Sequence, residues 1–280
     1  MRILVTGGTG YFGRAFVKHL LDTQTAERIC IYSRGEYAQH QMREAMGNNP
    51  KLRWFIGDVR DRDRLQRAMH GCDVVVHAAA LKRIEVVEYN VLEAVATNVL
   101  GTENVVKAAI DAGVKKAVLL STDKACDPCN AYGMSKALAE RIFLSAKHYA
   151  GTDGPIFAVT RYGNVAGSTG SVIPMWRDHL ARYSWVPVTD PEMTRFWMTK
   201  QEAVDLVFNT IQIMKGGELT IPELPAYRVG DLAEAMGAEM RITGTRGGEK
   251  WHEAMESGKT SDLARRMSVE EIKEELKHVE

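Results

Sequence analysis

Residues 122–136 contain side chains that serve as acids, bases and proton carriers in enzymes: Thr122, Asp123, Lys124, Tyr132 and Lys136. Tyr132 and Lys136 are four residues apart, so on a helix they lie on the same face. A nearby ammonium favours the phenolate, which predicts a lowered pKa for Tyr132. Tyr132 would then accept the proton of a substrate hydroxyl while a hydride leaves the same carbon.

The adjacent residues Asp123 and Lys124 supply an acid and a base that an ordinary dehydrogenase does not need. Oxidation of a sugar at C4 makes the C5 proton acidic, because the resulting carbanion delocalises into the new ketone. A desolvated, neutral Lys124 would remove that proton, and Asp123 would protonate the departing C6 hydroxyl. The pair therefore predicts a redox-neutral elimination of water. The competing interpretation is a surface ion pair, which contributes little.

These residues need a scaffold, and short apolar runs that alternate with amphipathic segments predict one built from βαβ units. The predicted strands are residues 3–6, 29–33, 52–56, 74–77, 116–120 and 156–161. The predicted helices are residues 11–21, 37–46, 62–69, 91–112 and 131–149. This order describes an α/β, Rossmann-type doubly wound parallel sheet, which binds ligands at the carboxyl ends of its strands.

The regular alternation ends after residue 161. Residues 163–200 are rich in glycine, proline and tryptophan and are predicted as loops with short elements. A helix near 200–214 would return to the sheet, and a charged helix near 269–278 would end a small mixed lobe. We expect an NADP-binding Rossmann domain at 1–165 with that returning helix, and a mostly substrate-binding lobe at 166–280.

The first predicted strand runs into a glycine-rich turn, TGGTGYFG. Glycines permit a tight turn, let the backbone approach a pyrophosphate and let the helix pack close to the sheet. The phosphates then meet free amides at the helix N-terminus. A turn between a predicted strand and helix is the context that favours a dinucleotide site. The expected contacts in this turn are Gly7, Thr9, Gly10, Tyr11, Phe12 and Gly13.

The end of the second strand selects between NAD and NADP. NAD enzymes usually place a carboxylate there, whereas this chain has Ser33 and Arg34. A hydroxyl and a guanidinium suit a 2′-phosphate, so the sequence favours NADP. NAD stays open because Glu36 follows closely. Asp58 and Val59, after the third strand, would bound the adenine, although Asp58 could instead cap a helix.

The composition excludes several functions. The formal net charge is zero, which provides no basic surface for nucleic acid and no polybasic membrane anchor. No run approaches the roughly 18 to 20 apolar residues that span a bilayer. The first residues form a strand rather than a signal peptide. We therefore expect a cytoplasmic protein that binds neither nucleic acid nor membrane.

The four cysteines include a C-x-x-C pair, Cys126 and Cys129. Such a pair is typical of a redox centre or half of a zinc site, and the simpler interpretation is two small loop residues. No second C-x-x-C or nearby H-x-H completes a metal site. We therefore expect no metal, and a redox role stays open.

Seven segments resemble motifs of the UDP-N-acetylglucosamine 4,6-dehydratases that start pseudaminic-acid and related glycan pathways. They are TGGTGYFG, FIGDVRD, HAAALKRIEVVEYN, STDKACDPCNAYGMSK, RYGNVAGSTGSV, DPEMTRFW and GGEKWHE. The resemblance runs from Met1 to about Glu253. It implies the extended short-chain dehydrogenase/reductase fold, NADP held through the cycle, UDP-N-acetylglucosamine or a related UDP-sugar as substrate, and a homo-oligomer between dimer and hexamer.

The resemblance also implies a role for each matching residue. Asp123 would be the acid, Lys124 the C5 base and Tyr132 the O4 base. Thr122 would hydrogen-bond O4, and Lys136 would hold the nicotinamide ribose. The implied substrate-binding residues are Lys82, Asn164, Val172, Arg195, Arg246 and Glu249. The other implied cofactor-binding residues are Ala78, Ala80, Lys82, Asn98, Tyr132, Lys136 and Tyr162.

Two other functions share parts of this pattern. A UDP-sugar 4-epimerase uses Thr, Tyr and Lys but needs no elimination pair, so Asp123 and Lys124 argue against it. A nonenzymatic NADP-sensing protein often lacks the Tyr or Lys, and both are present here. Tyr132 is shared with the C5-inverting dehydratases, which favours inversion. Several other relatives have Met at this position, but so do some inverting ones. The residue therefore does not decide, and a C5-retaining dehydratase stays open.

Overall fold

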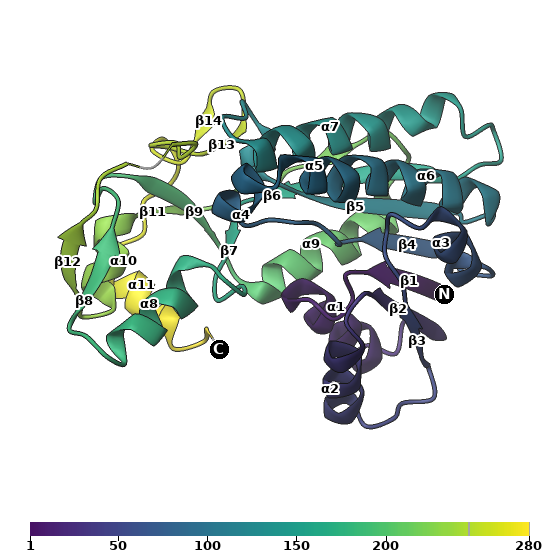
Figure 1. Cartoon of the computed structure of the whole chain (residues 1–280), viewed down its shortest axis with the longest axis horizontal. Helices are drawn as coiled ribbons and strands as arrows, with labels where there is room; N and C mark the ends of the chain where they lie inside the picture. The colour runs from purple at the N-terminus through teal and green to yellow at the C-terminus, as the bar shows by residue number, and fades with distance from the viewer. Residues whose placement is uncertain (246, 280) are drawn as a thin grey trace.

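The computed structural model describes residues 1–245 and 247–279, and a seven-stranded sheet forms its larger part (Figure 1). The strands are β1 (Arg2–Thr6), β2 (Arg28–Ser33), β3 (Leu52–Ile56), β4 (Val74–His77), β5 (Lys116–Thr122), β6 (Ile156–Tyr162) and β10 (Leu219–Thr220). Their order is β3-β2-β1-β4-β5-β6-β10, and each pair is parallel. The order reverses between β1 and β4, which confirms the predicted doubly wound sheet.

All six predicted strands form, and β10 is a seventh that the sequence does not predict. Its residues Leu219 and Thr220 pair with Val159 and Thr160 of β6. A run of two residues carries no periodicity from which a strand could be recognised. It becomes a strand because the outer edge of β6 offers backbone groups that need hydrogen-bond partners.

Helices cover both faces of the sheet (Figure 1). One face carries α1 (Tyr11–Asp22), α2 (Glu36–Met46) and α9 (Lys200–Ile213), and the other α3 (Arg62–Met69), α6 (Gly101–Asp111) and α7 (Ala131–Ser145). Successive strand residues point to opposite faces, so Ile3 and Val5 pack in one layer and Leu4 in the other. The predicted returning helix is α9. With both faces covered, ligands have access at the carboxyl edge.

The predicted helix at 91–112 is divided by a π-helical turn. The segment consists of α5 (Val91–Ala94), η1 (Val95–Leu100) and α6, and the short helix α4 (Ile84–Tyr89) precedes it. Such turns are frequent at functional sites because the extra residue redirects neighbouring side chains. Here η1 places Thr97 in the wall of a cavity and Asn98 behind that wall.

The chain after β6 forms a smaller lobe. Its elements are β7 (Asn164–Val165), α8 (Val172–Leu180), β8 (Trp185–Val188), β9 (Thr194–Met198), β11 (Ala226–Arg228), α10 (Val229–Ala235), β12 (Glu239–Ile242), β13 (Ala254–Glu256), β14 (Lys259–Thr260) and α11 (Val269–Leu276). Trp176, Val186, Trp197, Tyr227 and Leu232 belong to its separate apolar core. In Figure 1 this lobe faces the carboxyl edge of the large sheet.

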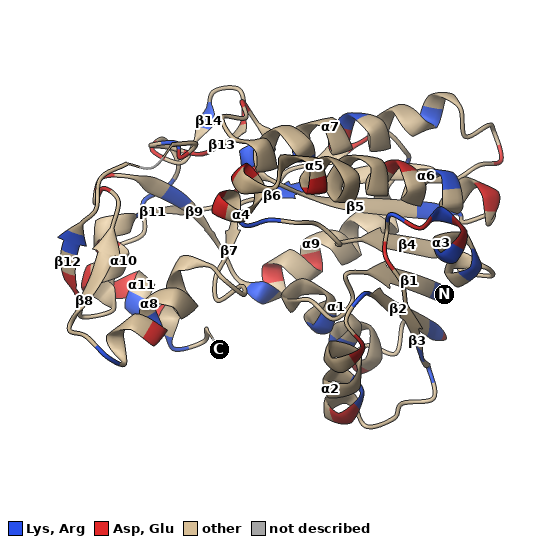
Figure 2. Ribbon diagram, in the orientation of Figure 1, with Lys and Arg blue, Asp and Glu red and all other residues tan. Residues whose placement is uncertain are grey.

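Charged residues of both signs are interspersed along the two lobes (Figure 2). This distribution agrees with the zero net charge. Among the described residues, no helix combines the length and apolar character that crossing a membrane requires.

Candidate active site

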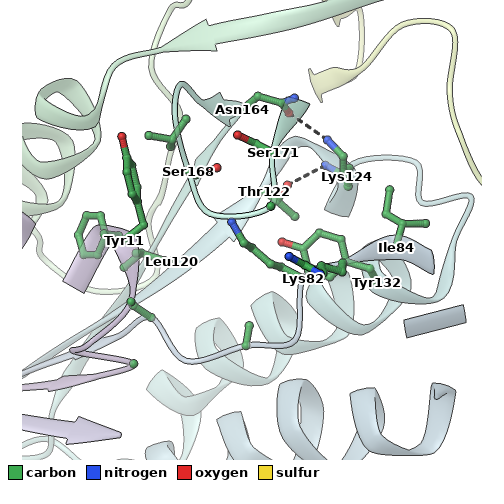
Figure 3. A pocket seen from close by; sticks show the side chains of 18 of the residues that line it. Tyr11, Lys82, Ile84, Leu120, Thr122, Lys124, Tyr132, Asn164, Ser168 and Ser171 are labelled. Atoms are coloured by element: carbon green, nitrogen blue, oxygen red, sulfur yellow. Dashed lines mark hydrogen bonds between the residues drawn. The ribbon is translucent and has the colours of Figure 1, made fainter. Parts of the chain in front are cut away.

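The site is a cavity of about 740 Å³ at the carboxyl ends of the strands. Its wall combines the glycine-rich turn, the segments that follow β2 and β4, the end of β5, helix α7 and residues of the smaller lobe. Figure 3 shows Lys82, Thr122, Lys124, Tyr132 and Asn164 converging on it. A cavity of this size suits a small-molecule ligand or cofactor.

The glycine-rich turn brings backbone atoms, rather than side chains, to the cavity. Gly7 has φ +65°, and a Cβ there would lie 2.9 Å from the Ala79 nitrogen. A Cβ on Gly13 would lie 2.6 Å from the Gly7 carbonyl oxygen, so glycine is needed for this close approach. Gly10 precedes α1, whose first turn has neither a side-chain cap nor an acidic residue. The amides of that turn therefore suit a phosphate group.

Every predicted cofactor-binding residue except Asn98 lines the cavity. These residues are Gly7, Thr9, Gly10, Tyr11, Phe12, Gly13, Ser33, Arg34, Asp58, Val59, Ala78, Ala80, Lys82, Tyr132, Lys136 and Tyr162. Two further lining hydroxyls, Thr97 Oγ1 and Ser121 Oγ, are buried without a hydrogen-bond partner. Buried polar groups are normally paired, so these hydroxyls fit a polar ligand such as a dinucleotide.

Asn98 lies behind the cavity wall. Its Oδ1 accepts from the Leu81 amide at 2.8 Å, and its Nδ2 donates to the Leu81 carbonyl at 2.9 Å. The same Nδ2 donates to Ser135 Oγ at 3.0 Å. Asn98 was predicted to contact the cofactor. In the structure its side-chain amide instead holds the backbone of Leu81, between Ala80 and Lys82.

Two guanidinium groups flank Asp58 near the end of β2. Arg60 Nη2 lies 2.8 Å and Arg34 Nη1 3.8 Å from Asp58 Oδ2. Burial raises the pKa of Asp58, but hydrogen bonds from Arg60 outweigh it and hold the pKa below its ordinary value. Asp61, not Asp58, caps α3. Arg34 and Asp58 line the cavity and Glu36 does not, so a guanidinium and a carboxylate both face a ligand there.

The catalytic candidates lie where β5 ends and the short helix η2 (Asp123–Ala125) begins. Lys124 Nζ lies 3.0 Å from Asp123 Oδ1 and 3.2 Å from Asn164 Oδ1. A third oxygen, Glu253 Oε1, lies 3.1 Å from the same nitrogen. The Lys124 side chain is 15% exposed and lines the cavity. The lysine therefore faces the ligand space and not bulk water.

The two carboxylates determine the protonation state of Lys124. Burial lowers the pKa of this ammonium, but the charges of Asp123 and Glu253 outweigh burial and raise the pKa above its ordinary value. The prediction of a neutral Lys124 is therefore wrong for the protein by itself. The second carboxylate, Glu253, is far away in the sequence, which is why local spacing does not reveal it.

Asp123 is fully buried and lies behind Lys124. Its Oδ1 accepts hydrogen bonds from Thr122 Oγ1 at 2.9 Å and from Lys124, whereas its Oδ2 has no partner. Burial is the main cause of its raised pKa, so this carboxyl can hold a proton. A Cβ on Gly163, which lines the cavity, would lie 3.5 Å from Oδ2. Phe196 Cβ and Met255 Cε would lie 2.6 and 3.2 Å from the same Cβ, so Gly163 is needed for close packing between Asp123 and the cavity wall.

Tyr132 lies on α7 with its phenol near Thr122 and Lys124 (Figure 3). Burial raises the pKa of Tyr132 to about 12, although Lys124 and a hydrogen bond with Thr122 act in the opposite direction. Lys136 donates to the Leu120 carbonyl at 2.7 Å, and burial lowers its pKa to about 8. The predicted lowering of the Tyr132 pKa is wrong for the protein by itself, because burial prevails. The cation beside the phenol is Lys124.

Predicted substrate-binding residues line the same cavity: Lys82, Asn164, Val172, Arg195 and Glu249. The remaining one, Arg246, lies outside the described residues. Arg195 Nη1 donates to the Thr194 carbonyl at 2.7 Å and to the Trp251 carbonyl at 3.2 Å. Among the described residues, the buried Glu249 Oε2 has no hydrogen-bond partner, which fits a ligand that donates a hydrogen bond.

Three polar residues of the wall are not evident from the sequence. Glu253 is the last residue of the GGEKWHE motif, and only that motif could have pointed to it as a site residue. Ser171 Oγ, just before α8, is buried without a partner. Tyr227 on β11 pairs with Arg195 on β9, and burial raises its pKa to about 12. Only strand pairing places Tyr227 at the site, so no local motif could identify it.

Cys126 and Cys129 are free thiols in the loop between η2 and α7. Cys129 Sγ lies 3.3 Å from the Gly248 carbonyl, and Lys250 Nζ donates to the Cys126 carbonyl at 2.5 Å. The loop therefore holds residues 248–250 against the catalytic segment. In the described ranges, no group of three or more His, Cys, Asp or Glu residues is placed to hold a metal.

Comparison with known proteins agrees with this geometry. Residues 3–274 match the family described as polysaccharide biosynthesis protein. The chain belongs to this family. The UDP-N-acetylglucosamine 4,6-dehydratase (inverting) of Campylobacter jejuni is 45% identical over 93% of this chain and 79% of its own. A UDP-glucose 4-epimerase of Rickettsia felis is 42% identical over 93% of this chain and 80% of its own.

Solved structures have the same fold as this family member. Pen from Bacillus thuringiensis has a TM-score of 0.94 and 34% identity, covering 99% of this chain and 98% of its own. DesIV, a dTDP-glucose 4,6-dehydratase of Streptomyces venezuelae with NAD bound, has a TM-score of 0.82 and 24% identity, covering 96% and 89%. These neighbours confirm the predicted extended short-chain dehydrogenase/reductase fold.

Proposed function

We propose that this family member is an NADP-dependent UDP-N-acetylglucosamine 4,6-dehydratase that inverts C5. The observation that carries the proposal is the position of Lys124, in the cavity wall between the Asp123 carboxyl and the Tyr132 phenol. Elimination from the oxidised sugar needs a second base for the C5 proton, which Lys124 can supply beside the phenol, whereas simple hydride transfer needs only the phenol. The name of the Campylobacter jejuni relative supports the same activity.

Tyr132 and Thr122 prepare the substrate. The Thr122 hydroxyl hydrogen-bonds O4 of the sugar, and Tyr132 takes the O4 proton as its phenolate, the state that the neighbouring Lys124 cation favours. A bound nicotinamide would supply the acceptor of the C4 hydride and its donor to C6, after which C5 would take a proton derived from solvent. Lys136 would hold the ribose beside that ring, and burial lowers the pKa of its ammonium to about 8.

Asp123 and Lys124 carry out the elimination. Transfer of one proton from the Lys124 ammonium to the Asp123 carboxylate creates an amine base and a carboxylic acid without changing the net charge. The amine takes the C5 proton, and the C5–H electron pair forms the C5=C6 double bond. The C6 hydroxyl leaves as water with the Asp123 proton. Asp123 Oδ2 is buried, so this transfer requires the Asp123 carboxyl to become accessible from the cavity.

The cofactor preference follows from the charges at the end of β2. Arg34 lines the cavity 3.8 Å from Asp58, and its side chain is 58% exposed, so its guanidinium can turn toward a 2′-phosphate. NAD is the nucleotide named in the DesIV structure. The choice between NADP and NAD is therefore tested separately, through Arg34.

The second candidate is a UDP-sugar 4-epimerase. Rickettsia relatives that are 41–42% identical carry the name UDP-glucose 4-epimerase. An epimerase would use Thr122 and Tyr132, but it gives no task to the buried pair Asp123 and Lys124. We therefore favour the dehydratase.

Incubation with UDP-N-acetylglucosamine in deuterated water separates the candidates. The dehydratase yields a 4-keto-6-deoxy sugar that has lost water and carries solvent deuterium at C5. The epimerase yields an isomer of unchanged mass, which would refute the proposal. Proton NMR of the fresh product gives the C5 configuration and decides between inversion and retention.

We also propose that residues 166–280 mostly form the substrate-binding lobe, and that the enzyme is a cytoplasmic homo-oligomer between dimer and hexamer. The Cys30 and Cys72 sulfurs lie 3.9 Å apart as free thiols, which favours a reducing compartment. Tyr89 and Leu92 are 90% and 81% exposed on neighbouring helices, which favours association. Light scattering coupled to size-exclusion chromatography measures the assembly.

A further inference from the structure

Glu253 is a buried, charged residue of the cavity wall that the mechanism above does not use. It is 3% exposed, and its Oε1 lies 3.1 Å from Lys124 Nζ. Its Oε2 has no hydrogen-bond partner and lies 3.8 Å from Lys250 Nζ. Because a buried carboxylate is costly unless it is paired, its contact with Lys124 is significant.

The backbone of Glu253 is held from two sides. Its N–H donates to Ser261 Oγ at 2.9 Å, and its carbonyl accepts from the Ser261 N–H at 2.8 Å. Two residues later, the Met255 carbonyl accepts from Arg161 Nη1 at 2.6 Å. Arg161 also forms a buried two-point ion pair with Glu140 of α7, at 3.0 and 2.6 Å. The smaller lobe therefore presents Glu253 to Lys124 from a fixed position.

The three oxygens around Lys124 limit what its nitrogen can do. An ammonium has three N–H donors, and here three oxygens lie within 3.2 Å of the nitrogen: Asp123 and Asn164 accept hydrogen bonds, and Glu253 forms an ion pair. In this state the nitrogen has no lone pair for a substrate proton. One proton must first move to a carboxylate, because the Asn164 amide oxygen cannot hold it.

The surroundings of the two carboxylates differ. Glu253 faces Lys250 and Arg195 as well as Lys124, and these cations outweigh burial and keep its pKa below the ordinary value. Asp123 is fully buried, with Thr122 as its further hydrogen-bond donor, and burial raises its pKa. The proton therefore moves more easily to Asp123 than to Glu253.

We propose that Glu253 is a positioning residue for the elimination: its carboxylate stays ionised, holds the Lys124 nitrogen at the cavity and directs the mobile lysine proton to Asp123. Atoms and charges balance in this proton transfer. One N–H bond of Lys124 breaks, one O–H bond of Asp123 forms, and the electron pair left on nitrogen takes the C5 proton. Glu253 continues to accept a remaining N–H. This inference rests on the proposed function.

Removal of the Glu253 charge changes the electrostatic balance at Lys124. The ionisable groups that face this cluster come from η2, α7, β9, β11 and the segment before β13; they are Asp123, Tyr132, Arg195, Tyr227 and Lys250. Without Glu253, the lysine keeps one carboxylate and still lies near Arg195. The pKa of Lys124 therefore falls, and the ascending limb of the pH–rate profile moves to lower pH.

The test compares Glu253→Gln and Glu253→Asp with Glu256→Gln as the control. Glu256 lies on β13 and pairs with the exposed Lys259, outside the cavity wall. Single-turnover absorbance of the reduced nicotinamide follows the first oxidation, and C5 deuterium in the product follows elimination. NMR of protein labelled with ¹⁵N-lysine measures the pKa of Lys124, with Lys124→Gln identifying its signal.

In Glu253→Gln, we expect cofactor reduction within about threefold of wild type and elimination slowed about 100-fold, the lower range for proton-transfer catalysis. The Lys124 pKa should fall by about one unit or more. Glu253→Asp should restore part of the elimination rate, and Glu256→Gln should resemble wild type. An unchanged Lys124 pKa and pH profile in Glu253→Gln would overturn the proposal, and so would equal loss of oxidation and elimination.

Two further outcomes are decisive. If Glu253→Gln does not fold, Glu253→Asp decides: slower elimination with intact oxidation supports the proposal, and wild-type rates in both steps overturn it. If the wild-type product is an isomer without C5 deuterium, the dehydratase function fails. The proposal then fails with respect to elimination, and the NMR titration separately shows whether Glu253 sets the Lys124 pKa.

Discussion

Replacement of Lys124 by methionine removes the central cation of the site but keeps a long, flexible side chain. The ammonium lies 3.0 Å from Asp123 and 3.1 Å from Glu253, and these residues are 0% and 3% exposed. In Lys124→Met the two carboxylates remain buried without this counter-ion. Removal of one partner from a buried ion pair costs about 3–5 kcal/mol. We expect a loss of stability of this size near neutral pH.

The loss of stability in Lys124→Met should grow as the pH rises. In Lys124→Met, burial and mutual repulsion raise the folded-state pKa of the carboxylates above their unfolded values. The folded protein then binds more protons than the unfolded chain, so its stability falls as the pH rises. A cost of about 3–5 kcal/mol corresponds to a raised pKa of roughly 2–4 units. The destabilisation should therefore be small near about pH 5 and complete near about pH 8.

Urea denaturation of wild type and Lys124→Met at several pH values measures this difference. Lys259→Met is the control, because Lys259 is exposed and pairs with Glu256 at the surface. Lys124→Met also tests catalysis: C5 deuterium incorporation should fall about 10²–10⁴-fold, whereas cofactor binding should remain. A Lys124→Met protein with the wild-type dependence of stability on pH would refute the buried charge cluster. Near-normal elimination would refute Lys124 as the base.

Three other perturbations test separate parts of the site. Tyr132→Phe should slow cofactor reduction by UDP-N-acetylglucosamine about 10²-fold or more in single-turnover absorbance, because the phenol takes the O4 proton; full activity would remove Tyr132 from the mechanism. Arg34→Ser should raise the calorimetric Kd for NADP about tenfold or more and change that for NAD little, because it removes a charge-assisted hydrogen bond to the 2′-phosphate; equal changes would argue against NADP. His77 lies between the hydroxyls of Thr6 at 2.7 Å and Thr102 at 3.1 Å, and burial lowers its pKa to about 3. Since its unfolded pKa is about 6.5, the unfolded chain binds more protons between these values, and the His77 contribution to stability falls by about 2 kcal/mol from pH 7 to pH 5. His77→Asn should lose this part of the acid sensitivity in denaturation experiments, and an unchanged slope would contradict it.

The sequence by itself determined the sheet, most of its helices and the dinucleotide end of the site. Those features have local signals: apolar residues with strand or helix periodicity, and a glycine-rich turn in which a Cβ on Gly7 or Gly13 would collide with backbone. The four-residue spacing of Tyr132 and Lys136 likewise placed both on α7. The two-residue strand β10 and the π turn η1 were not predictable, since neither has a pattern of its own.

Only the tertiary structure decided the protonation states of the catalytic groups. Glu253 reaches Lys124 because contacts of Ser261 and Arg161 hold the β13 segment against the site, and Asp123 together with Glu253 raises the pKa of the lysine. Burial reverses the expected pKa of Tyr132 and places Asn98 behind the wall. The charge of an ionisable group depends on desolvation and on charges within a few ångströms. Desolvation and nearby charges are both set by residues distant in the chain, so the spacing of residues within one motif cannot predict them.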